Sequence, residues 1–98
     1  MDFRPVAEKA TAALRTMSVP KELDLRGQMR DEALLALDRY LDSAVMAKLQ
    51  TVTIIHGKGT GALRQAVQNE LRSNRLVKSF RNGTFGEGEM GVTIVELR

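Results

Sequence analysis

One segment of the sequence combines glycines, a lysine and a histidine in the way that phosphate-binding loops do. It reads His56-Gly57-Lys58-Gly59-Thr60-Gly61 and precedes a helical pattern. Glycines let backbone N–H groups approach an anion, and the following helix N-terminus and Lys58 supply positive charge. The segment therefore predicts a phosphate site, whose candidate residues are Gly57, Lys58, Gly59, Thr60, Gly61 and, in the first turn of the helix, Arg64. A tight turn with an incidental lysine is the alternative, and neither the Walker A nor the dinucleotide-binding motif is present.

His56 is the only histidine in the chain, which excludes a metal site built from several imidazoles. A single imidazole changes its charge near neutral pH, so His56 is a candidate general acid or base. A lone histidine at the end of a strand is more often structural, and this alternative stays open. The position of His56 beside the phosphate-binding loop favours the catalytic interpretation.

Asp24 and Arg26 are two residues apart in an alternating segment, so they project to the same face of an expected strand. There they can bind one phosphodiester together or form an exposed ion pair without a further role. The sequence has no Asp-x-Asp cluster for a metal. A divalent cation, Mg²⁺ or Mn²⁺, would therefore bind through Asp24 and the phosphate of a substrate, and the sequence leaves the need for one open.

Composition narrows the class of protein. The chain has 98 residues, enough for one core, and its 43% hydrophobic and 28% charged residues are typical of a soluble globular domain. The absence of cysteine excludes disulfides, zinc fingers and thiol catalysis. No apolar run is long enough to cross a bilayer and the N-terminus resembles no secretory signal, so we expect a cytoplasmic protein without a membrane partner.

The basic residues are unevenly distributed. The formal net charge is +3, and six basic residues stand between Lys58 and Arg81 against one acidic residue, Glu70. Such a stretch attracts anions, although a solvated helix face is the simpler interpretation.

These residues are positioned by a regular alternation of elements. Hydrophobic periodicity predicts an N-terminal accessory helix or linker over residues 1–21 and a single domain over residues 22–98 in the order βαβαββ. The expected helices cover residues 5–17, 30–49 and 63–71, and the expected strands cover residues 22–26, 51–55, 76–80 and 91–97. A glycine-rich turn over residues 82–90 joins the last two strands.

The crossover connections bring the polar segments together. If the first two strands are parallel, Arg26-Gly27 and His56-Gly57-Lys58 leave the same edge of the sheet, where ligands of open α/β sheets bind. If the second crossover is also parallel, the turn 82–90 emerges at that edge too. We therefore expect three polar, glycine-containing segments to converge.

Three motifs, in order, resemble the Smr (small MutS-related) domain. They are Leu23-Asp24-Leu25-Arg26-Gly27, the stretch Ile54–Gly61 with Leu63-Arg64, and Glu87–Leu97. The first is similar to the copy found at the C-terminus of the second class of bacterial MutS-type ATPases. The resemblance covers residues 22–98 and departs from the family twice. Many members have histidine in place of Arg26, and the usual Gly-Gly-x-Gly is Gly88-Glu89-Met90-Gly91 here.

The resemblance implies an α/β two-layer sandwich in which a four-stranded mixed sheet carries two helices. It also implies nucleic acid as the partner, with DNA nicking in some members and RNA cleavage or ribosome association in others. By position it implies catalytic roles for Asp24, Arg26, His56 and Lys58, and nucleic-acid contacts at the loop and at Gly88 and Gly91. We thus expect a structure-selective nicking endonuclease acting on DNA, derived from a larger MutS-type ATPase. A non-catalytic module that binds DNA, RNA or the ribosome is the alternative, and the oligomeric state is open.

Overall fold

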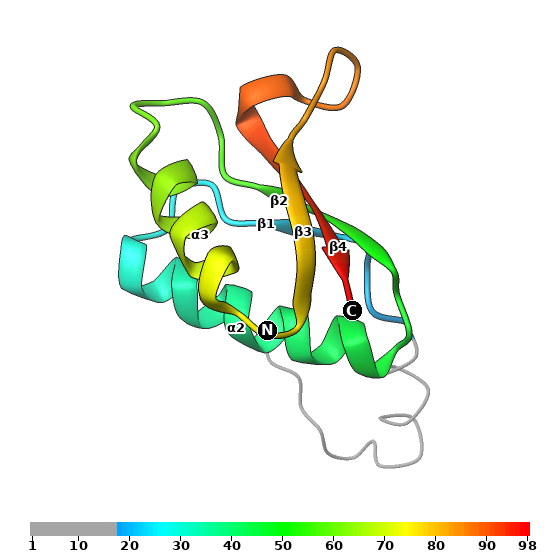
Figure 1. Ribbon diagram of the computed structural model, residues 1–98. Coiled ribbons are helices and arrows are strands. Elements are labelled where there is room, and N and C mark those ends of the chain that lie inside the picture. The colour runs from blue at the N-terminus through cyan, green and yellow to red at the C-terminus, as the bar shows by residue number, and fades with distance from the viewer. Residues whose placement is uncertain (1–17) are drawn as a thin grey trace.

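The computed structural model describes residues 18–98, so the helix expected over residues 5–17 lies outside the described part of the chain. The elements alternate as the hydrophobic pattern predicts (Figure 1). In chain order they are β1 (Glu22–Asp24), α2 (Arg30–Met46), β2 (Thr51–Ile55), α3 (Ala62–Ser73), β3 (Val77–Asn82), the short 3₁₀ turn Glu89–Gly91 and β4 (Val92–Leu97). No helix among residues 18–98 is long and apolar enough to cross a membrane.

The four strands form one mixed sheet in the order β1-β2-β4-β3. β1 pairs parallel to β2, whereas β4 lies between β2 and β3 and runs antiparallel to both. β1, β2 and β3 therefore share one direction, and only β4 runs the other way. This arrangement confirms the expected four-stranded mixed sheet with two helices.

The two helices and one sheet face form a single core. It contains Leu37 and Leu41 from α2, Val67 from α3, and Ile54 and Val95 from the sheet, all fully buried. Because side chains alternate along a strand, Thr53 and Glu96 lie on the opposite face. The molecule is thus a two-layer sandwich with both helices packed on the same face, as Figure 1 shows.

Helix α2 ends three residues before the predicted boundary, and the cause is local. Lys48 takes a left-handed conformation with φ of 64°. Its N–H donates to the Val45 carbonyl, while the N–H of Leu49 reaches back to the Ala44 carbonyl at 3.0 Å. This pattern is a Schellman motif, normally closed by glycine, and it stops the helix whatever the propensity of the residues that follow.

Two strands end two residues away from the predicted boundary, and β3 and β4 each begin one residue later than predicted. β1 ends at Asp24 rather than at residue 26, because the chain turns at Gly27, where φ is +82° and the N–H of Gln28 donates to the Leu25 carbonyl. β3 continues two residues past the prediction because Asn82 still pairs with Thr93 of β4.

The shared direction of β1, β2 and β3 places the ends of all three strands at one edge of the sheet. The segments that follow them are residues 25–29, residues 56–61 and the turn 83–91. The backbone N–H groups of His56 and Gly57 both donate to the carbonyl of Gly91, at 3.1 Å and 2.9 Å. The predicted convergence of the three segments is confirmed.

Truncating the core at α2 tests this packing. Leu37 is fully buried and Leu35 is 54% exposed on the same helix. We expect Leu37→Ala to lower the free energy of unfolding by about 2–5 kcal/mol, because it removes buried contacts and leaves a cavity. Leu35→Ala should change it by less than about 0.5 kcal/mol. Urea denaturation measures both, and equal effects would contradict the described orientation of α2.

Candidate functional site

The end of β1 carries a bidentate ion pair between Asp24 and Arg26. Arg26 Nε donates to Asp24 Oδ1 at 2.9 Å and Nη2 donates to Oδ2 at 2.7 Å, while the backbone N–H of Arg26 donates to Oδ1 at 3.0 Å. The hydrogen bonds from the Arg26 guanidinium and backbone lower the pKa of Asp24 to about 2, so this carboxylate is ionised at neutral pH. Both side chains are exposed, and Arg26 Nη1 takes no part in these bonds.

The loop that follows β2 lies against the same edge. Gly57, with φ of +83°, lies beside Arg26, because a Cβ at this glycine would be 3.3 Å from Arg26 Cγ. At the other end of the loop, Thr60 Oγ1 accepts the N–H of Ala62 at 3.2 Å, which fixes the start of α3. Gly61 also has positive φ, at +88°. The loop is thus held at its start by the sheet and at its end by the helix.

Lys58 and Arg64 bring positive charge to this loop, but Lys58 already has a partner. Its ammonium lies 3.6 Å from a carboxylate oxygen of Glu89, in the β3–β4 turn. Arg64 lies over the end of the loop, where Nη2 would be 3.3 Å from a Cβ at Gly61. The cations expected to hold phosphate are therefore gathered, and two of them, Arg26 and Lys58, are ion-paired within the chain.

His56 points into the fold rather than out of it. It is 5% exposed, and both ring nitrogens are hydrogen-bonded. Nδ1 lies 3.1 Å from the carbonyl oxygen of Gly57, and Nε2 lies 2.8 Å from the hydroxyl of Thr93, which is fully buried. Gln68 of α3 donates to the same hydroxyl at 3.0 Å and to Asn82 Oδ1 at 2.9 Å. His56 thus begins a polar network that connects β2, β4, α3 and β3.

The hydrogen bonds of His56 assign its tautomer. A carbonyl oxygen only accepts, so Nδ1 carries the proton and Nε2 accepts the hydroxyl proton of Thr93. Burial lowers the pKa of His56 below 6.5, and the nearby charge of Arg64 lowers it further, against the opposing effect of the Gly57 hydrogen bond. The neutral ring is therefore the resting form, and both of its nitrogens are occupied by the protein.

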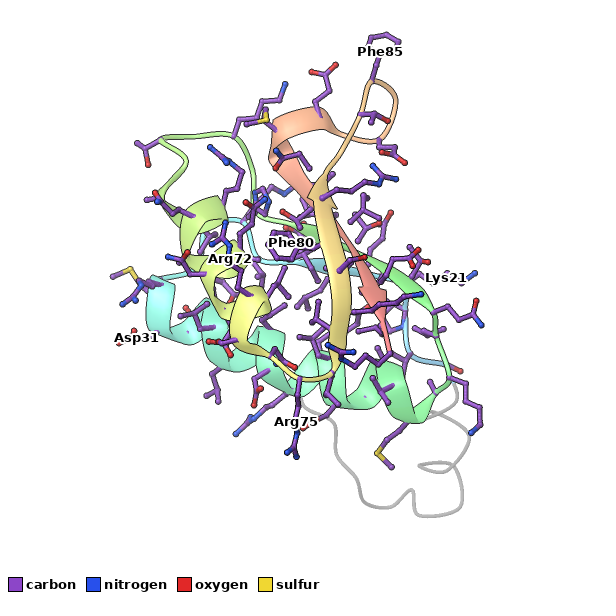
Figure 2. All side chains as sticks on the ribbon, in the orientation of Figure 1. Lys21, Asp31, Arg72, Arg75, Phe80 and Phe85 are labelled. Atoms are coloured by element: carbon purple, nitrogen blue, oxygen red, sulfur yellow. The ribbon has the colours of Figure 1, made fainter. Side chains whose placement is uncertain are left out.

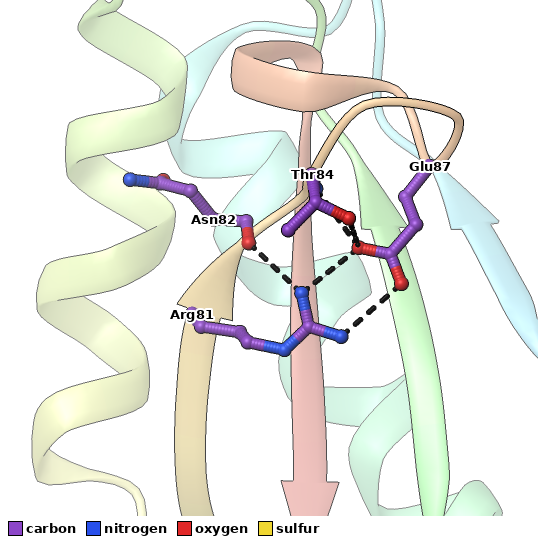
Figure 3. A network of polar contacts seen from close by, with 4 residues as sticks. All are labelled: Arg81, Asn82, Thr84 and Glu87. Carbon is purple, nitrogen blue, oxygen red and sulfur yellow. Dashed lines mark hydrogen bonds and ion pairs between the residues drawn. The ribbon is translucent and has the colours of Figure 1, made fainter.

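The β3–β4 turn is stabilised by one carboxylate, that of Glu87 (Figure 3). It accepts two hydrogen bonds from the guanidinium of Arg81, at 2.9 Å and 3.1 Å, and two from the backbone and hydroxyl of Thr84, both at 2.8 Å. These bonds, with that from Arg81 first, lower the pKa of Glu87 to about 2. The turn consequently has a defined shape although it projects from the sheet.

Two further features of the turn follow from this shape. Phe85 stands at the tip of the turn, as Figure 2 shows, and its side chain is 91% exposed. Gly88 packs on Val92, where a Cβ would come within 2.7 Å of Cγ1. Gly91 contacts the loop directly, because its carbonyl binds His56 and Gly57. Gly88 therefore has a structural reason to be glycine, apart from any contact with phosphate, whereas a Cβ at Gly91 would be 3.5 Å from Lys58 Cγ, an ordinary contact.

The structure thus brings Asp24, Arg26 and Lys58 to one exposed edge and places His56 behind them. Asp24 binds Arg26, and no hydrogen bond joins it to His56 within residues 18–98. No group of three or more histidine, aspartate or glutamate side chains in this part of the chain forms a metal cage. Asp24 is the one predicted metal ligand, and both of its oxygens already bind Arg26. The donor set therefore does not fit a protein-built metal site.

The sequence analysis missed Thr93 and Gln68, which hold His56. One signal was available, because Thr93 stands on the same inward face as Val95 and Leu97, where a polar residue needs a partner. Glu89 was identified as a departure from the family's Gly-Gly-x-Gly, but its ion pair with Lys58 was not predicted. Its φ is 50°, a conformation that residues other than glycine seldom adopt.

The single histidine makes its environment directly measurable. We expect ¹H–¹⁵N NMR of the imidazole to show the Nδ1–H tautomer at neutral pH and a pKa below 6.5. Because the folded pKa lies below the unfolded one, the stability that depends on neutral His56 is complete above pH 6.5 and is lost as the pH falls through and below that value. An Nε2–H tautomer would contradict the assigned hydrogen bonds.

The charge of Glu89 and its left-handed backbone conformation can be tested separately. Glu89→Gln removes the partner of Lys58 and should tighten binding of a short oligonucleotide by about two- to five-fold at low salt. Glu89→Gly does the same and also relieves the left-handed backbone, so its free energy of unfolding should rise by about 1 kcal/mol. Fluorescence anisotropy and urea denaturation measure the two effects. Unchanged oligonucleotide binding in both variants would show that Lys58 does not contact the oligonucleotide.

Comparison with known proteins agrees with this geometry. A family model described as the Smr domain matches residues 23–98. The protein named Endonuclease MutS2 from Caldicellulosiruptor saccharolyticus is 61% identical over 85 residues, which cover 87% of this chain and 11% of that protein. The one from Geobacillus kaustophilus is 54% identical over 97 residues, 99% of this chain and 12% of that protein. The chain thus spans only a small part of the curated relatives that it matches.

A solved structure gives the same assignment. The crystal structure of the Smr domain of Thermus thermophilus MutS2 matches with a TM-score of 0.79 at 51% identity, over 81% of this chain and 99% of that chain. The residues that the family model matches include the Asp24–Gly27 turn, the His56–Gly61 loop and the β3–β4 turn described above. The chain belongs to the Smr domain family.

Proposed function

We propose that this domain binds nucleic acid at the edge formed by Asp24, Arg26 and Lys58 and nicks DNA there, selecting structure rather than sequence. The observation that carries the proposal is the convergence of two exposed cations and one ionised carboxylate on a rigid edge. The names of the MutS2 relatives support an endonuclease, and the share of their length that this chain matches supports a domain of a larger MutS-type ATPase.

The cations fit the charge that develops during phosphodiester hydrolysis. Water attacks phosphorus, the bond to the leaving oxygen breaks, and negative charge accumulates on the non-bridging oxygens. Arg26 is oriented by Asp24 and keeps Nη1 available for one of these oxygens. Lys58 binds another once its exposed pair with Glu89 is exchanged for phosphate. Binding to phosphate without base contacts explains a preference for structure over sequence.

His56 takes a positioning role in this proposal. Its ring connects the loop to Thr93 and Gln68, so it holds the backbone of Gly57 and the stem of Lys58 in place. Direct proton transfer to or from substrate would require the ring to leave both hydrogen bonds. The proton of the attacking water therefore passes to solvent, because both oxygens of Asp24 already bind Arg26 and a pKa of about 2 makes this carboxylate a weak base.

A non-catalytic nucleic-acid-binding module is the second candidate. One observation favours it: Asp24, Lys58 and His56 are all occupied by partners from the same chain. Such a module would bind DNA, RNA or the ribosome through the same cations and leave chemistry to other parts of a larger protein. Phe85, exposed at the tip of the turn, is available for stacking on an unpaired base under either candidate.

Nicking of supercoiled plasmid separates the two candidates. We expect the domain to convert plasmid to the open circular form, and Arg26→Gln and Lys58→Gln each to slow the reaction by about 100-fold, the usual cost of losing one charge-stabilising donor. His56→Gln should slow nicking but leave its dependence on pH unchanged. Arg39→Gln, an exposed position on α2, is the matched control for a lost positive charge.

Each reaction is run with Mg²⁺, with Mn²⁺ and with EDTA, and binding is scored on the same samples by gel shift. Binding without nicking in every condition would reject the nuclease and support the binding module. Equal nicking by wild type and both site variants would show that the edge does not perform the reaction. Loss of the pH dependence in His56→Gln would show that His56 acts as the general acid or base.

A further inference from the structure

The basic stretch of the sequence divides into two sets in the structure. Lys58 and Arg64 lie at the His56–Gly61 loop, and Arg81 binds Glu87 in the β3–β4 turn. The other three basic side chains, Arg72, Arg75 and Lys78, surround a groove of about 460 Å³ between the C-terminal end of α3 and β3. We propose that this groove, which we call the α3–β3 groove, is a second contact for the phosphate backbone of nucleic acid. The inference rests on the proposed nucleic-acid binding and extends it to a second site.

No residue among those the structure describes neutralises the cations of the α3–β3 groove by an ion pair. Among residues 18–98, Arg98 is its only other charged wall residue, and no acidic side chain lines it. The four ion pairs in this part of the chain include none of its cations. Carboxylates do stand near its borders, since Asp38, Asp42 and Glu70 share a neighbouring hollow with Arg75, and Glu96 shares one with Lys78. They form no ion pair with these cations, so the groove attracts a polyanion.

Two contacts fix the orientation of the Arg72 guanidinium. Its guanidinium carbon lies 5.6 Å from the centre of the Phe80 ring, and Nη1 donates to Asn69 at 2.7 Å. Figure 2 shows Arg72 and Phe80 beside one another between α3 and β3. A guanidinium held on an aromatic face keeps its remaining N–H groups in one orientation, so less conformational entropy is lost when phosphate binds.

The position of the groove relative to the candidate edge sets the length of the ligand. β3 begins at the groove with Val77 and ends at Asn82, where the β3–β4 turn begins. At about 3.3 Å per residue, a strand of this length spans roughly 20 Å. One strand of DNA covers that distance in about six nucleotides at about 3.4 Å each. Because β1 and β3 are the two outer strands of the sheet, Asp24 and Arg26 lie beyond the turn and further still from the groove. A single nucleic acid therefore contacts both sites only when it is longer than about six base pairs.

Binding of hairpin-capped duplexes of six and twenty base pairs tests the inference by fluorescence anisotropy over a range of salt concentrations. The groove variant carries Arg72→Gln, Arg75→Gln and Lys78→Gln. The control variant carries Lys21→Gln, Arg30→Gln and Arg39→Gln, which remove the same charge from other exposed positions. We expect the groove variant to bind the long duplex at least tenfold more weakly than the control and to reduce the slope of log K against log salt by about 2–3, at about 0.9 per lost phosphate contact. On the short duplex the two variants should be equal.

The remaining outcomes separate this inference from the proposed function. If Arg26→Gln weakens binding but the groove variant equals the control on long DNA and RNA, the inference is overturned and the groove serves another anion, such as an acidic protein segment. If the wild type binds neither nucleic acid, both proposals fail. Should urea denaturation show that the loss of Arg72 unfolds the domain, the double variant Arg75→Gln, Lys78→Gln decides, with an expected slope change of about 2.

Discussion

The insertion of β4 between β2 and β3 is the constraint on which the rest of the structure depends. Because β4 runs antiparallel to both neighbours, β1, β2 and β3 share one direction and end at one edge. The start of β4 lies at that same edge, and the Gly91 carbonyl there accepts two N–H groups from the loop after β2. Three segments distant in sequence thus form one surface, and reversing any strand would separate them.

Within residues 18–98, Arg26 and Lys58 at this edge are ion-paired, whereas none of the cations of the α3–β3 groove is. Arg26, Lys58 and Arg81 each have a carboxylate partner, namely Asp24, Glu89 and Glu87. These pairs are exposed, so a phosphate can replace a carboxylate at little net cost. The internal carboxylates orient the cations before a ligand arrives and weaken binding of an isolated phosphate. Stronger attraction of a long polyanion comes from the unpaired cations, so the two surfaces have complementary roles in one proposal.

The sequence predicted what depends on local patterns. The order of elements followed from hydrophobic periodicity. Asp24 and Arg26 do meet as their spacing suggested, but the strand ends at Asp24 and the contact is made across the turn, where the Arg26 N–H also donates to Asp24 Oδ1. Convergence of the loops followed from crossover rules. The predicted ends of the helix at residue 49 and of the strand at residue 80 were wrong, because they depend on a left-handed backbone at Lys48 and on the pairing of Asn82 with Thr93 of β4.

The sequence pointed to the residues of the candidate site but not to the contacts that they make. The pattern identified His56, yet it contained nothing that linked this ring to Thr93 and Gln68, which come from elements far along the chain. The pattern also marked Glu89 as a departure in the turn, whereas its pairing with Lys58 depends on the approach of two loops. Which side chains face solvent depends on contacts between distant segments. These contacts exist only in the folded sheet.

The measurement that tests the central claim most directly is a map of the ligand-contacting surface at residue resolution. The ¹H–¹⁵N spectrum of the domain is followed while a twenty-base-pair duplex is added. The account predicts shifts that gather at residues 24–27, 56–61 and 88–91 and continue along the α3–β3 groove, with the exposed face of α2 unchanged. Shifts confined to α2, or to the sheet face on which Thr53 and Glu96 lie, would contradict it.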